Sequence, residues 1–213
     1  SEYKGLSYAQ QLPDFDIKAR AKGPMSVIDA VSSSMIRETP GQISNYPMSE
    51  LGALPGQIAL FFDAGGASPV HRFDGSFAPF AYLDYVTSAV AYRVVPERPG
   101  VLVIGAGGGT DGLAALSHGA AQVTAVEVDP NVFGLVRGPL GEFSGGLYER
   151  DDVTPVVAEG RGFLESQPKQ YDLIQIALLD SFTATAAGVH ALNESYLYTI
   201  EAIERYLDRL TPG

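Results

Sequence analysis

The chain contains no cysteine and only three histidines among its 213 residues. Without cysteine it can form no disulfide, no thiolate nucleophile and no cysteine-ligated metal site. The histidines, His71, His118 and His190, are too few and too scattered to indicate a metal site. No nucleophile elbow of a serine hydrolase and no Gly-Lys-Ser/Thr phosphate loop is present. The sequence therefore excludes thiol chemistry and gives no indication of a metal centre or of an ATP phosphate site.

Positive charge is also scarce, with 14 Lys and Arg against 25 Asp and Glu and a net charge of −11. This balance disfavours nucleic acid or an anionic membrane surface as a direct partner and suits a cationic substrate such as a polyamine. No apolar run approaches the ~18 residues of a membrane-spanning helix, and no signal peptide opens the chain. An apolar content of 46% and a charged content of 18% indicate a globular protein.

The stretch VLVIGAGGGTDGLAALSHGAAQVTAVEVD, residues 101–129, carries the strongest functional signal. An apolar strand runs into a turn containing Gly105, Gly107 and Gly109, a helix follows, and a second strand ends on Glu127. Glycines allow a tight turn and close approach of a ligand, and an acid at the next strand end is placed to bind both hydroxyls of a ribose. We therefore predict a nucleoside site. The G-x-G-x-G spacing favours S-adenosylmethionine (SAM) or a relative over NAD.

Two regions follow from the pattern of apolar runs and turns. Residues 1–76 contain short β-rich runs at 15–20, 26–31, 58–63 and 70–73, which predict a small antiparallel β subdomain. Residues 77–213 predict a Rossmann-like, methyltransferase-type α/β core with a largely parallel sheet. Its expected helices are 79–94, 129–143, 161–167 and one whose apolar face holds Leu197, Ile200, Ile203, Leu207 and Leu210; its later strands are 153–158 and 171–179. A doubly wound sheet would continue past residue 213, so we expect C-terminal strands to be missing from this chain.

Three acids follow strands of the predicted core, namely Glu127, Glu159 and Asp180. Ligands bind at the carboxyl ends of parallel strands. Glu159 could accept a hydrogen bond from an adenine amino group, with Gly160 leaving room for the ring, or it could be an ordinary solvated acid. Asp180 could be a base or a carboxylate for an amine, or a helix cap. Asp111, in the first turn after the glycines, most simply complements the helix dipole.

Several motifs together resemble the spermidine synthase (polyamine aminopropyltransferase) family: VLVIGAGGG, VTAVEVDP, AEGRGFL, YDLIQIALLDS and ALNESYLYTIEA. The resemblance covers roughly residues 58–213 and is closest to bacterial spermidine-synthase-like domains that are often fused to membrane-spanning segments. It implies a methyltransferase-like core that moves an aminopropyl group from decarboxylated SAM to a diamine. It further implies a cytoplasmic domain of a bacterial inner-membrane protein with spanning segments elsewhere in the parent chain, and it leaves a homodimer open.

The resemblance assigns roles to individual residues. Gly105, Gly107 and Gly109 match the glycine loop and Glu127 the ribose acid; Glu159 stands where the family has an adenine-binding Asp. Tyr82 matches the tyrosine of the Tyr-His-Glu run at the diamine site, and we expect it to assist Asp180 in orienting or deprotonating the amine.

Two departures concern the chemistry. Gly108 replaces the family's donor-binding Asp, and Ala177 replaces the Asp that deprotonates the amine. These departures leave open a SAM-dependent methyltransferase and a catalytically silent binding module as alternatives to aminopropyl transfer.

Overall fold

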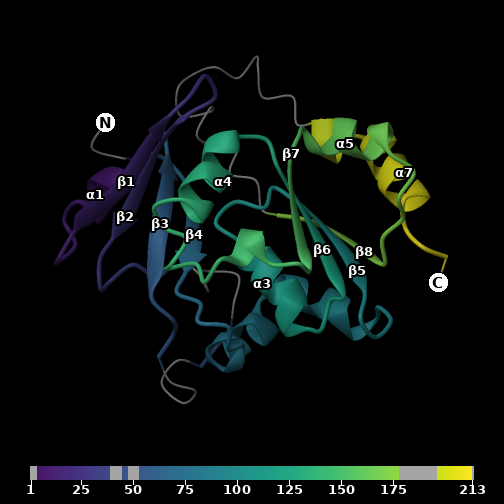
Figure 1. Ribbon diagram of the computed structural model, residues 1–213, viewed down its shortest axis with the longest axis horizontal. Coiled ribbons are helices and arrows are strands. Elements are labelled where there is room, and N and C mark those ends of the chain that lie inside the picture. Colours follow the sequence, from purple (N-terminus) through teal and green to yellow (C-terminus); the bar gives the residue numbers. More distant parts are fainter. Residues whose placement is uncertain (1–3, 39–44, 48–52, 178–195, 213) are drawn as a thin grey trace.

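The computed structural model describes residues 4–38, 45–47, 53–177 and 196–212. Within these residues an antiparallel sheet and a parallel sheet stand next to each other, with helices between them and on the far face of the parallel sheet (Figure 1). This arrangement confirms the predicted fold class, an α/β core preceded by a small antiparallel subdomain.

The antiparallel sheet has the order β1-β2-β3-β4. Its strands are β1 (Asp16–Lys22), β2 (Val27–Ser32), β3 (Gln57–Phe62) and β4 (Ala67–His71), close to the four predicted runs. The central strands β2 and β3 are buried on both faces. One face packs on the short helix α1 (Gly5–Ala9), which the sequence did not predict, and the other joins the main core. The sheet is thus packed into the rest of the molecule through one face.

The parallel sheet has the order β7-β6-β5-β8. Its strands are β5 (Gly100–Ile104), β6 (Gln122–Glu127), β7 (Val153–Val157) and β8 (Leu173–Ile176). The central strand β5 is apolar throughout because its side chains face two cores: Val101 and Val103 face one, Leu102 and Ile104 the other. All four strands end at the same edge, where ligands bind in such sheets.

The helices cover the two faces of the parallel sheet separately (Figure 1). The helices α3 (Thr110–Ser117) and α4 (Pro130–Arg137) contribute to the core shared with the antiparallel sheet. The helices α5 (Gly160–Ser166) and α7 (Ile200–Asp208) pack on the opposite face. Among the described residues no helix is both long enough and apolar enough to cross a membrane.

The predicted helix over 79–94 is wrong in type and continuity. The structure has two short 3₁₀ helices, η1 (Ala78–Tyr85) and η2 (Thr87–Arg93), separated by Val86 in an extended conformation. The apolar stripe that suggested one helix ends there, because Val90 and Val94 are 65% and 84% exposed.

Other elements also differ from the prediction. The helix predicted over 129–143 ends at Arg137, because Gly138 and Pro139 follow and proline cannot continue the hydrogen-bond pattern. The last helix begins after its N-cap Thr199 and packs through Ala202 and Tyr206. Of the predicted stripe, Leu197 packs on the same cluster, but Ile200, Ile203 and Leu207 are exposed. The short 3₁₀ helices η3 (Leu147–Glu149) and η5 (Tyr196–Tyr198) were not predicted. The fourth core strand is β8, and residues 178–179 of its predicted range lie outside the described residues.

Candidate functional site

The glycine loop connects the end of β5 to the start of α3. The N–H groups of Gly105 and Ala106 both donate to the carbonyl of Val126 on β6, at 2.8 and 2.9 Å, which fixes the loop at the carboxyl edge of the sheet. Gly107 and Gly109 have φ angles of +50° and +104°, in the region that favours glycine. The loop therefore needs glycine at these two positions for its backbone alone.

The side of the loop that faces the antiparallel sheet is closely packed. A Cβ on Gly107 would overlap the hydroxyl of Ser68, and a Cβ on Gly108 would overlap the carbonyl of Pro69. The Ser68 hydroxyl also accepts a hydrogen bond from the Gly108 N–H at 2.9 Å. Strand β4 thus lies directly against the loop, and position 108 has no room for an acidic side chain.

Glu127 is buried at the end of β6 and binds the loop. Its Oε2 accepts a hydrogen bond from the Gly107 N–H at 3.0 Å. Its Oε1 accepts from the N–H groups of Val128 and Asp129 at 2.8 and 3.1 Å. The carboxylate predicted to bind a ribose therefore also ties the glycine loop to the end of β6.

Tyr148, in η3, supports the loop from beneath and was missed in the sequence. Its hydroxyl lies 3.0 Å from the Ala106 carbonyl and 2.8 Å from the Gly107 carbonyl and donates to this pair. Burial, together with the charges of Glu127 and Asp111, raises its pKa, so the hydroxyl keeps its proton. No local sequence pattern marks this residue, because its partners are about 40 positions away.

Glu159 and Gly160 begin α5 at the end of β7. The Glu159 carboxylate accepts from the N–H groups of Arg161 and Gly162 at 2.9 and 2.7 Å, so it caps the helix. A Cβ on Gly160 would overlap a methyl group of Ile104 and lie 3.2 Å from Leu197. The space beside Gly160, which was predicted to admit an adenine ring, is occupied on this side by Ile104.

Tyr82 is fully buried in η1. Its hydroxyl lies 3.2 Å from Nδ1 of His71 on β4, and Nε2 of the same ring lies 2.9 Å from the hydroxyl of Thr110. Burial lowers the pKa of His71 to about 3, so the imidazole is neutral. This row of three side chains joins η1, β4 and the first turn of α3. Tyr82 therefore reaches the glycine-loop helix through His71 and Thr110 rather than through a surface of its own.

A second row of hydrogen-bonded side chains, which was not predicted from the sequence, lies under the first turn of α3. Nε2 of Gln175 on β8 donates to Oδ1 of Asp111 at 2.5 Å, and the Tyr92 hydroxyl donates to Oε1 of Gln175 at 2.8 Å. Burial raises the pKa of Asp111 to about 6, against the lowering effect of the Gln175 hydrogen bond. The sequence did carry a signal for this row: a glutamine within the apolar run YDLIQIALL.

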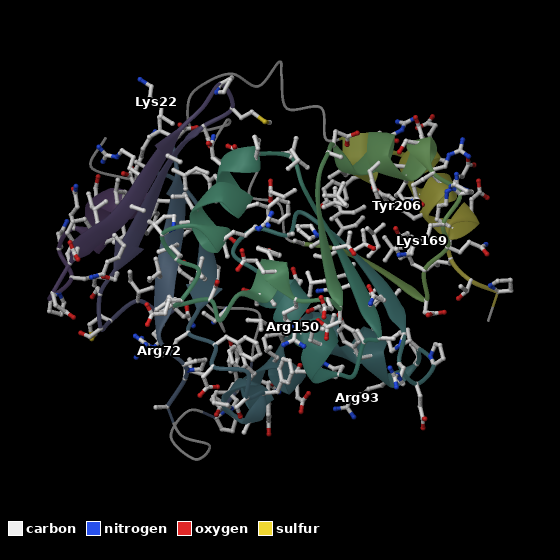
Figure 2. The ribbon with its side chains drawn as sticks, viewed as in Figure 1. Lys22, Arg72, Arg93, Arg150, Lys169 and Tyr206 are labelled. Atoms are coloured by element: carbon white, nitrogen blue, oxygen red, sulfur yellow. The ribbon has the colours of Figure 1, made fainter. Side chains whose placement is uncertain are left out.

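The described acids at this edge form no ion pair. None of the ion pairs among the described residues includes Asp111, Glu127, Asp129 or Glu159. In Figure 2, Lys22 and Arg72 lie on the antiparallel sheet side of the molecule. In the described part of the chain no group of three or more His, Asp or Glu could hold a metal ion.

Asp180 lies outside the described residues. Of the predicted site residues, the structure brings the glycine loop and Glu127 together, and Asp111 lies beneath the loop helix. This set can hold a ligand's polar groups at the sheet edge and attract a cation.

Comparison with known proteins places these residues in a described family. A family model for the spermine/spermidine synthase domain matches residues 80–210, more than half of the chain. The polyamine aminopropyltransferase of Korarchaeum cryptofilum is 33% identical over 87 residues, which are 41% of this chain and 26% of that protein. The polyamine aminopropyltransferase 2 of Hyperthermus butylicus is 31% identical over 114 residues, or 53% and 35% of the two chains.

Two solved structures have the same fold. The spermidine synthase of Thermotoga maritima gives a TM-score of 0.56 at 19% identity and covers 91% of this chain and 52% of its own. A spermidine synthase in complex with the transition-state analogue AdoDATO gives 0.55 at 19% identity, over 92% and 53%. This chain therefore spans about half the length of the solved structures and a smaller part of the curated relatives.

Proposed function

This chain belongs to the spermine/spermidine synthase family, and from that premise we propose that it binds decarboxylated SAM and transfers its aminopropyl group to an amine. The observation that carries the proposal is the buried carboxylate of Glu127 bonded to the glycine loop at the end of β6. In parallel α/β sheets this is the position of a ribose-binding acid. A solved family structure, which is similar in fold, holds the analogue AdoDATO.

Glu127 would serve the loop and the ribose together. A carboxylate has about four acceptor positions, and three backbone N–H groups already bind this one. Ribose hydroxyls would therefore share the carboxylate with the loop. Binding and loop geometry are coupled through this one side chain.

The remaining predicted residues take supporting roles in the proposal. Glu159 would approach the adenine only if it gives up part of its hydrogen bonding to α5. Tyr82 would position Thr110 and the loop helix through His71. Asp180 is proposed to hold the acceptor amine.

Calorimetry with methylthioadenosine, decarboxylated SAM and SAM tests the nucleoside site. We expect the unmodified chain to bind decarboxylated SAM and methylthioadenosine. Glu127→Gln, which keeps one oxygen for the loop but loses the charge, should weaken binding by about 10- to 100-fold, since a hydrogen bond to a charged group contributes ~1.5–3 kcal/mol. The matched control is Glu204→Gln on the exposed surface of α7, which should bind normally.

Two results would contradict the proposal. Binding of none of the three nucleosides would remove the nucleoside site, and unchanged affinity in Glu127→Gln would move it away from the end of β6.

A further inference from the structure

We propose that Asp111 is the proton acceptor for the attacking amine, and that Gln175 and Tyr92 hold its carboxylate in place for this role. The inference rests on the proposed function and names the residue that would make the acceptor nucleophilic. An amine that keeps its proton has no lone pair with which to attack, so a proton acceptor must lie within reach.

The hydrogen bonding of the described acids at this edge singles out Asp111. Glu127 accepts three backbone N–H groups, and Asp129 and Glu159 each cap a helix through backbone N–H groups. Among the described residues Asp111 accepts only the side-chain amide of Gln175, through Oδ1. Its Oδ2 therefore keeps its acceptor capacity.

Gln175 and Tyr92 fix the carboxylate. The Tyr92 hydroxyl donates to the amide oxygen of Gln175, which determines that the amide NH₂ group points to Asp111. An amide within a buried strand is stabilised only when both of its ends are bonded, and here both are. Ala177 lies two residues further along and points to the same face of the sheet. Its methyl group offers no proton acceptor there.

The protonation behaviour of Asp111 suits the role. Burial raises its pKa to about 6, while the Gln175 hydrogen bond acts in the opposite direction. At neutral pH the group is thus mostly ionised, yet it takes up a proton far more readily than an exposed aspartate. Tyr92 stays protonated, because burial and the charge of Asp111 raise its pKa.

The other titratable groups around Asp111 come from each neighbouring element. Tyr148 on η3 stays protonated because burial raises its pKa, and His71 on β4, which contacts Thr110, stays neutral. His118, at the end of α3, stacks on Tyr92 with 4.4 Å between ring centroids and pairs with Asp84 at 2.8 Å. The charge of Glu127 on β6 raises the pKa of Tyr148, as the charge of Asp111 does.

The proposed step balances protons and electrons. The acceptor's ammonium group gives one proton to Asp111, and the freed nitrogen lone pair attacks the carbon next to the sulfonium. The carbon–sulfur bond breaks and its electron pair stays on sulfur, so methylthioadenosine leaves as a neutral thioether. The product is a secondary ammonium ion, and Asp111 returns its proton to water.

The test measures amine binding as well as turnover. Calorimetric titration of putrescine into the chain saturated with methylthioadenosine, between pH 5 and 8, reports the charge of the proton acceptor. We expect the unmodified chain to bind putrescine about tenfold more tightly at pH 7 than at pH 5, with a midpoint near 6, because the ammonium ion needs the ionised carboxylate. Asp111→Asn, which keeps the oxygen that Gln175 binds, should remove this pH dependence. It should also lower turnover with decarboxylated SAM by about 10²- to 10⁴-fold.

Two further variants separate a proton acceptor from a purely structural residue. Tyr92→Phe frees the amide of Gln175 and should move the midpoint to higher pH, because the amide no longer holds its NH₂ group on the carboxylate. His118→Gln removes the imidazole that stacks on Tyr92 and should leave the midpoint where it is. Asp208→Asn, on the exposed face of α7, is the matched control for loss of one aspartate charge.

The outcomes distinguish this inference from the proposed function. Normal binding of methylthioadenosine, with putrescine affinity that is absent, independent of pH or unchanged in Asp111→Asn, would overturn the role of Asp111 and leave the nucleoside site standing. A midpoint that disappears in His118→Gln would assign the titration to the imidazole and overturn the role as well. Failure to bind any nucleoside would overturn both.

Discussion

Replacing Asp111 with asparagine should stabilise the fold at neutral pH. Burial raises the pKa of this carboxyl from 3.8 to about 6, a shift of about two units. Each unit corresponds to ~1.4 kcal/mol, so the ionised group lowers the free energy of unfolding by about 3 kcal/mol above pH 7. Asparagine keeps the oxygen that Gln175 binds and carries no charge. The variant should therefore be more stable than the unmodified chain by up to about 3 kcal/mol at pH 7.5.

The sign and the pH window follow from proton binding. Because the folded state binds the proton more tightly than the unfolded state, stability falls as the pH rises from about 4 to about 6. The advantage of Asp111→Asn should thus shrink to roughly half at pH 5. Urea unfolding followed by circular dichroism at pH 7.5 and 5.0 measures both values, with Asp208→Asn as a control that should change little. An Asp111→Asn variant that is no more stable at pH 7.5, or an advantage that does not narrow at pH 5, would refute the reasoning.

Two predictions concern the glycine loop. Gly108→Asp introduces the acid that the family resemblance implies at this position. It should lower the free energy of unfolding by ~1–3 kcal/mol, because its Cβ meets the Pro69 carbonyl. Gly112→Ala, whose Cβ meets nothing within 4 Å, should raise the free energy of unfolding by up to ~1 kcal/mol. Thermal unfolding compares the pair, and equal melting temperatures would show that β4 moves aside. Tyr148→Phe should lower the free energy of unfolding by ~1–3 kcal/mol and weaken methylthioadenosine binding, because the loop carbonyls lose their donor. Normal affinity by calorimetry would show that the loop keeps its shape without the Tyr148 hydroxyl.

The core of the fold was predictable because its signals are local. The apolar run before Gly105, the glycines, and the acid at the end of the next strand all lie within 30 residues, so the order strand, loop, helix and strand follows from sequence alone. The end of α4 was also predictable, since Gly138 and Pro139 follow its last residue. The break at Val86 was not, because it depends on which valines the core buries.

The location of the candidate residues at the edge of the parallel sheet was predictable, but their hydrogen bonding was not. From the sequence, Asp111 was interpreted as a residue that complements the helix dipole. Its hydrogen bond to Gln175 could not be predicted, because the two residues are 64 positions apart. Glu159 reads as a ligand acid, although the N–H groups that it caps follow it immediately. A side chain's type and place on a strand fix where it can act. The partners that decide its charge and freedom come from the tertiary fold.

The contact of β4 with the glycine loop has a consequence for how such a motif changes in evolution. Gly107 and Gly108 are confined by Ser68 and Pro69, and Gly109 by Leu147, all of them atoms of the protein itself. A descendant that had lost every ligand would still lose stability on replacing any of these glycines, so selection for folding alone would retain them. Drift after loss of function should instead appear first where a functional side chain lowers the stability of the fold. In this chain Asp111 is such a position, because its buried carboxylate lowers the free energy of unfolding at neutral pH.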